Sequence, residues 1–154
     1  MKWNHEKSIV LSKISVIVFF VIYLVVLVFC WNMNGQSSRL SAWLGVGLTE
    51  TYITFLRLVV YICAVPLGLI LFILYRLIQA IGKEEIFTAE NIRRLRQISW
   101  LCMLVGLICT GAAVYEIFFI IIAACAVFMG ILLRVIKNVF ERAQEIKEEN
   151  DYTI

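Results

Sequence analysis

The sequence predicts an all-α, polytopic membrane protein: a bundle of four transmembrane helices with the N- and C-termini both in the cytoplasm. Hydrophobic residues make up 62% of the 154 residues, and the mean hydropathy is +0.92. Soluble domains are only about 45–50% apolar. Four separate segments are long and apolar enough to cross a bilayer, and basic residues gather on one side of them. We therefore expect one integral membrane domain spanning residues 1–154.

The predicted spans follow from the length that a bilayer demands. A transmembrane helix needs about 20 mostly apolar residues, within a range of about 17–25. The segments that meet this condition are residues 14–31, 55–74, 98–114 and 117–135. Their many β-branched residues do not indicate strands, because an open sheet in lipid would leave its edges unpaired. No A-x-A-like cleavage site follows the first segment, so we interpret it as a retained anchor rather than a signal peptide.

The distribution of basic residues sets the predicted orientation. Arg39 and Arg57 lie on or near one side of the spans, and twelve basic residues lie on the other. The twelve are Lys2, Lys7, Lys13, Arg76, Lys83, Arg93, Arg94, Arg96, Arg134, Lys137, Arg142 and Lys147. The positive-inside rule therefore places both termini and the connection between the second and third spans in the cytoplasm. In the cytoplasmic tail, residues 136–154, apolar positions recur at helical spacing, which predicts that the last helix continues beyond the membrane.

A helix is expected to begin in the cytoplasmic connection, over residues 87–97. Thr88 is a suitable N-cap, Glu90 favours the positive end of the helix dipole, and Phe87 can contact Ile92. This segment is either a lipid anchor for anionic head groups or a docking surface for a cytoplasmic partner. The residues concerned are Phe87, Thr88, Glu90, Asn91, Arg93, Arg94 and Arg96.

Two features inside the predicted spans carry structural expectations. Arg57 lies about one turn into the second span, where it should reach the interface or form an ion pair with Glu116 or Glu50 at the outer leaflet. Pro66 lies in the middle of the same span and predicts a kink, because proline cannot donate to the preceding turn.

Small residues predict close packing of the third and fourth spans, which are joined tightly around Tyr115 and Glu116. Small side chains let helix backbones approach each other in lipid. Such residues recur at helical spacing at Gly106, Thr110 and Ala113, and at Ala123, Ala126 and Gly130.

No catalytic or metal-binding pattern is present in the sequence. The five cysteines form no CxxC pair, and His5 is the single histidine. Neither a nucleophile–base pair nor a phosphate-binding loop can be recognised. We therefore expect no enzyme activity, cofactor or metal, and we interpret the cysteines as small apolar residues within helices.

Two short stretches resemble a known family. The run Glu-Ile-Phe-Thr-Ala-Glu-Asn-Ile-Arg-Arg-Leu-Arg at residues 85–96 resembles the signature of the bacterial four-span membrane family catalogued as domain of unknown function 2975. The C-terminal motif resembles that family's ending, although tyrosine stands where leucine is usual; it comprises Glu149, Asn150, Asp151, Tyr152, Thr153 and Ile154. The resemblance extends over the whole chain in layout and implies a multi-pass protein of the bacterial cytoplasmic membrane. The family has no established activity, but its genes often lie beside one for a small helix-turn-helix repressor of the Cro/CI type.

The sequence leaves three functions open. The first is a regulatory or interaction protein that docks a small cytosolic helix-turn-helix regulator, as the resemblance implies. The second is a small transporter or a subunit of an efflux or stress-resistance system, which would require a homo-oligomer because four spans leave little room for a pathway. The third is self-protection against a membrane-active peptide, with which the apolar outer loop, residues 32–54, is compatible. The expected partners are the lipid bilayer and such a regulator, without direct nucleic acid binding.

Overall fold

The computed structural model describes residues 2–32, 49–82 and 88–151, with side chains from residue 7 to residue 150 of these ranges. Four helices form almost all of this part of the chain. They are α1 (Lys2–Asn32), α3 (Glu50–Ile81), α4 (Ala89–Ala112) and α5 (Phe119–Asp151). Each of the four is long and apolar enough to cross a membrane. The predicted all-α fold with four membrane-spanning helices is therefore confirmed.

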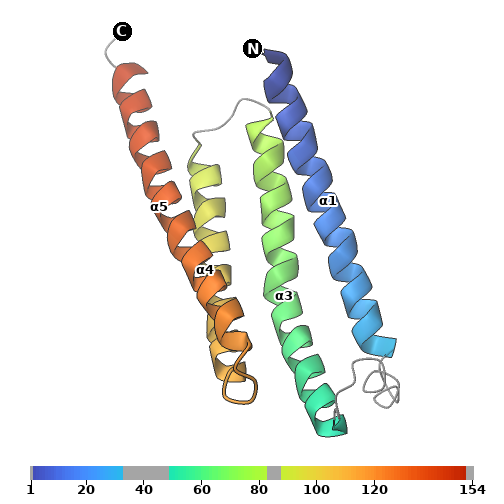
Figure 1. Cartoon of the computed structure of the whole chain (residues 1–154). Coiled ribbons are helices and arrows are strands. Elements are labelled where there is room, and N and C mark those ends of the chain that lie inside the picture. Colours follow the sequence, from blue (N-terminus) through green and yellow to red (C-terminus); the bar gives the residue numbers. More distant parts are fainter. Residues whose placement is uncertain (1, 33–48, 83–87, 152–154) are drawn as a thin grey trace.

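The helices lie side by side in the order α1, α3, α4, α5 and alternate in direction (Figure 1). The extensive contacts join α1 to α3, α3 to α4 and α4 to α5. As a result, the beginnings of α1 and α4 and the ends of α3 and α5 lie at one end of the molecule (Figure 1). We call this the basic end, because the described basic residues other than Arg57 and Arg134 lie in the halves of the helices nearer to it.

The helices extend beyond the predicted spans at this end. Helix α4 begins at Ala89, which confirms a helix start ahead of the third span, and α5 continues to Asp151, which confirms a helical tail. At the other end α4 stops at Ala112, two residues before the predicted limit of the span. The backbone N–H groups of Tyr115 and Glu116 both donate to the carbonyl of Ala112, at 3.1 and 3.2 Å, and so turn the chain. The predicted tight connection between the last two spans is confirmed.

Helices α4 and α5 approach each other closely at two glycines. A Cβ atom on Gly106 would lie 2.6 Å from Cγ2 of Val127, and one on Gly130 would lie 3.2 Å from the carbonyl oxygen of Ser99. These two glycines confirm the predicted packing of small residues. Thr110 does not take part: it is exposed, and its hydroxyl donates to the Gly106 carbonyl within the same helix at 2.8 Å.

A small apolar core joins α3, α4 and the first turns of α5. It comprises Val59, Cys63, Val105, Cys109, Ala112 and Ala123. All five cysteines are free, and two of them belong to this core, as expected for cysteines that act as small apolar residues.

Helix α1 contacts α3 through a reciprocal pair of tyrosines. The Tyr23 hydroxyl of α1 donates to the Ala64 carbonyl of α3 at 3.1 Å, and the Tyr61 hydroxyl of α3 donates to the Leu27 carbonyl of α1 at 3.5 Å. Close approach of the first pair depends on Gly68, where a Cβ atom would lie 3.0 Å from the Tyr23 hydroxyl oxygen. Pro66, two residues before Gly68, is buried within α3 and does not end the helix, and its predicted kink stays a prediction.

Candidate functional site

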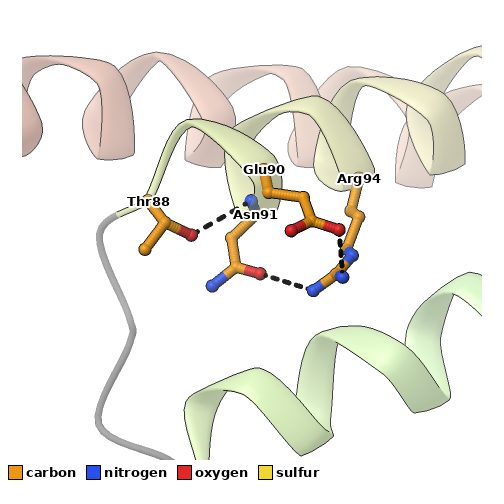
Figure 2. Close-up of polar contacts among 4 residues, drawn as sticks. All are labelled: Thr88, Glu90, Asn91 and Arg94. Carbon is orange, nitrogen blue, oxygen red and sulfur yellow. Dashed lines mark hydrogen bonds and ion pairs between the residues drawn. The ribbon is translucent and has the colours of Figure 1, made fainter.

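The first turn of α4 is held by the cap that the sequence predicts. The Thr88 side-chain oxygen accepts a hydrogen bond from the Asn91 backbone N–H at 3.4 Å (Figure 2). The backbone of Thr88 is extended, with φ −122° and ψ 148°, as an N-cap requires. Glu90 lies in the first turn, where its negative charge interacts favourably with the positive end of the helix dipole. Phe87 lies outside the described residues, so its contact with Ile92 stays a prediction.

Two of the predicted docking residues are held inside the protein. The Asn91 side chain is fully buried, and its Oδ1 accepts a hydrogen bond from Nη1 of Arg94 at 2.9 Å (Figure 2). Nη2 of Arg94 forms an ion pair with Oε1 of Glu90, and only 15% of the Arg94 side chain is exposed. The four-residue spacing of Glu90 and Arg94, with the acid first, is favourable on a helix, and this spacing could have predicted the pair from the sequence. Asn91 and Arg94 therefore shape the start of α4 rather than its outer surface.

Arg93 and Arg96 lie on the outer surface of α4. Arg93 is exposed, and 59% of the Arg96 side chain is exposed. Nη2 of Arg96 lies 3.6 Å from Oε1 of Glu141 on α5, and the other oxygen of Glu141 pairs with Lys137, four residues earlier on the same helix. Because exposed ion pairs contribute only about 0–1 kcal/mol, this contact aligns α4 with α5 more than it stabilises them.

The last turns of α5 extend beyond the beginning of α4 (Figure 1). Every residue from Glu145 to Asn150 is exposed, including Ile146, of which 58% is exposed. Within the C-terminal motif, Glu149 and Asn150 are thus exposed helical residues, and Asp151 ends the helix. Tyr152, Thr153 and Ile154 lie outside the described residues. We call residues 145–151 the projecting end of α5.

A polar cavity of about 240 Å³ lies between the end of α3 and the beginning of α4. Its lining residues are Arg76, Gln79 and Ala80 of α3, and Thr88, Glu90, Asn91 and Arg94 of α4. The sequence contains no pattern for this cavity, because its two halves come from helices whose relative placement only the fold determines.

At the opposite end, Glu116 has a partner that the sequence analysis missed. The Tyr52 hydroxyl of α3 donates to Oε2 of Glu116 at 2.9 Å. Arg57 is half-buried in the following turn of α3. Its predicted ion pair with Glu116 stays a prediction.

In the described part of the chain, no group of three or more His, Cys, Asp or Glu side chains is placed to hold a metal ion. Comparison with known proteins gives one result about the family. The chain matches the family described as "Protein of unknown function (DUF2975)" over residues 4–154. No curated protein and no solved structure matches the chain. The match covers nearly the whole sequence, and the chain therefore belongs to the DUF2975 family, consistent with the two short stretches that resemble it.

Proposed function

We propose that this chain is a membrane protein of regulatory or interaction type, and that its basic end faces the cytoplasm and docks a small helix-turn-helix regulator. The observation that carries the proposal is the projecting end of α5, whose described side chains are all exposed. An exposed helix end presents its side chains to whatever approaches the membrane surface.

The charge of the projecting end suits a DNA-binding partner. Residues 145–151 contain four acidic residues and Lys147 as the one basic residue. Surfaces that bind DNA are positively charged, because they must neutralise phosphates. An acidic helix end is therefore complementary to the same surface of a regulator that DNA would occupy. Opposite charges on the two partners would also accelerate their encounter.

The end of α5 also exposes apolar side chains beside the acidic ones. Ile146 is exposed between Glu145 and Lys147, and Val139, seven residues earlier, is 60% exposed. Residues seven apart lie on one face of a helix after two turns. This face offers a partner apolar surface beside the carboxylates, and burial of apolar surface on binding is favourable.

The exposed arginines on α4 are proposed to contact lipid rather than the regulator. Arg93 and Arg96 would lie at the level of the lipid head groups, where each basic residue contributes about 1 kcal/mol of attraction to an anionic surface. They would hold the start of α4 at the membrane, while the projecting end of α5 remains in the aqueous phase for a regulator.

The test is co-purification with defined variants. The chain would carry an N-terminal tag, would keep Ile154 free and would be solubilised in mild detergent. Bound proteins would be identified by mass spectrometry. We expect a small helix-turn-helix protein with the unaltered chain, and its loss from a chain truncated after Lys147 and from Glu145→Lys/Glu148→Lys. The matched control is Arg142→Gln, which changes an exposed residue on the same helix and should retain the regulator.

Recovery of no helix-turn-helix protein, or equal recovery with all the variants, would contradict the proposal. A co-purifying ATPase would instead favour a subunit of an efflux system. Protection of cells against a membrane-active peptide, independent of the truncation after Lys147, would favour self-protection.

A further inference from the structure

We propose that the polar cavity between the end of α3 and the beginning of α4 binds a phosphate group, carried either by an anionic lipid or by a soluble phosphate. This inference does not rest on the docking of a regulator. It concerns another face of the basic end and a ligand of different chemistry.

The cavity brings together two guanidinium groups from different helices. Arg76 comes from the last turns of α3 and Arg94 from the second turn of α4, and both line a cavity of about 240 Å³. Gln79 adds a side-chain amide. A guanidinium group is planar and presents a fork of N–H donors that matches the oxygens of a phosphate.

Both guanidinium groups retain donors for a ligand. A guanidinium has five N–H donors. Arg94 gives one to Glu90 and one to Asn91 (Figure 2). The contact that the structure gives Arg76 is with an aromatic ring: its guanidinium carbon lies 5.3 Å from the ring centroid of Phe72. The cavity therefore contains more N–H donors than its own acceptors use.

The charge of the lining favours an anion. Glu90 also lines the cavity, but it forms an ion pair with Arg94, so the charge of Arg76 remains in excess. The first turn of α4, capped by Thr88, adds the positive end of a helix dipole on the same side. Asn91 is fully buried and fixes Arg94. Binding of a ligand therefore loses little conformational entropy at the Arg94 side chain.

The position of the cavity suits either source of phosphate. Arg76 follows the predicted second span, residues 55–74, by two residues, which places its side chain at the boundary between membrane and water. Lipid phosphates lie at that level, and soluble phosphates reach it from the aqueous phase.

The test is binding to the purified full-length chain after delipidation, measured by native mass spectrometry. One arm adds phosphatidylglycerol, a second adds inorganic phosphate, and diacylglycerol is the comparison without phosphate. Arg76→Gln should weaken phosphate binding by about tenfold or more, since a hydrogen-bonded charge is lost from the cavity. Arg142→Gln removes the same charge from an exposed position of α5, outside the cavity, and should change binding by less than about twofold.

Binding of phosphatidylglycerol alone, dependent on Arg76, would identify a lipid head group as the ligand. Binding of inorganic phosphate with the same dependence would identify a soluble ligand. An Arg76→Lys variant keeps the charge without the planar fork and should bind more weakly than the unaltered chain but more tightly than Arg76→Gln. Equal weakening by Arg76→Gln and Arg142→Gln would reveal only diffuse attraction and overturn the inference. Absence of binding in both phosphate arms would also overturn it.

Discussion

Ser99 of α4 donates a hydrogen bond of 2.7 Å to the backbone carbonyl of Gly130 on α5, and both residues are buried. The absence of a side chain at Gly130 is what permits the approach, because a Cβ atom there would lie 3.2 Å from the Ser99 carbonyl oxygen. A hydroxyl group within a membrane helix thus finds its acceptor on the neighbouring helix. The last two helices form the most closely packed part of the described chain.

Gly106 should be sensitive to the addition of a single methyl group. In Gly106→Ala the new Cβ would lie 2.6 Å from Cγ2 of Val127, and relief requires either a change of the Val127 rotamer or movement of α5. We expect a loss of about 1–3 kcal/mol in the free energy of unfolding, measured in detergent. Gly111→Ala is the control, because no atom lies within 4 Å of its added Cβ, and it should not destabilise the protein. Equal losses in the two variants would contradict the packing.

The two helix starts offer a matched test of capping. Thr88→Ala removes a side chain that accepts from the Asn91 N–H, and should cost about 0.5–2 kcal/mol of stability. Thr49 occupies the same position before α3 but makes no capping hydrogen bond through its side chain. Thr49→Ala should therefore leave the thermal unfolding midpoint unchanged. A greater effect at Thr49 than at Thr88 would show that the cap is not what orders the start of α4.

The Tyr23 hydroxyl should stabilise the packing of α1 against α3. Tyr23→Phe keeps the ring but removes the hydrogen bond to the Ala64 carbonyl, and hydrogen bonds between membrane helices contribute on average about 0.6 kcal/mol. We expect a small decrease in the thermal unfolding midpoint in detergent, larger when Tyr61→Phe is added. Tyr75→Phe, at an exposed position of α3, provides the comparison and should have no effect. An unchanged midpoint in the double variant would exclude the tyrosine pair as a source of stability.

Tyr52 and Glu116 should behave as one energetic unit. Tyr52→Phe and Glu116→Gln each weaken the hydrogen bond of 2.9 Å between α3 and the connection that precedes α5. Hydrogen bonds to charged groups contribute about 1.5–3 kcal/mol, and the partly buried site here should give a value at the lower limit. A double-mutant cycle should show that the two losses do not add. Additive losses would indicate that Glu116 acts through another group, and a cycle of Glu116 with Arg57 would then test the predicted ion pair.

Much of the fold could be predicted because its determinants are local in the sequence. Four apolar segments, the Thr88 cap and the continued apolar spacing in the tail each predict one helix or one helix end, without reference to the others. The small residues at Gly106 and Gly130 also predict a contact, because two consecutive antiparallel spans must meet.

The candidate site could be predicted only in part, because its chemistry depends on which way side chains face. The sequence placed Arg93, Arg94 and Arg96 together as a basic surface, and only the fold distinguishes the exposed Arg93 from Arg94, which Glu90 and Asn91 hold in place. Prediction of the cavity lined by Arg76 requires the relative position of α3 and α4, and hydrophobic periodicity carries no information about that position. The Tyr23 hydrogen bond has a backbone carbonyl as acceptor, and every residue carries one, so no sequence pattern identifies it.

Docking of a cytosolic regulator requires that the basic end faces the cytoplasm. The decisive measurement is labelling of intact cells with a membrane-impermeant maleimide, in a chain whose five cysteines are replaced by alanine. Two single cysteines would be introduced at exposed positions, Thr49→Cys before α3 and Glu148→Cys in the projecting end of α5. We predict that Thr49→Cys is labelled in intact cells, and that Glu148→Cys is labelled only after the membrane is disrupted. Labelling of Glu148→Cys in intact cells would place the projecting end outside the cell and contradict both the predicted orientation and the docking of a cytosolic regulator.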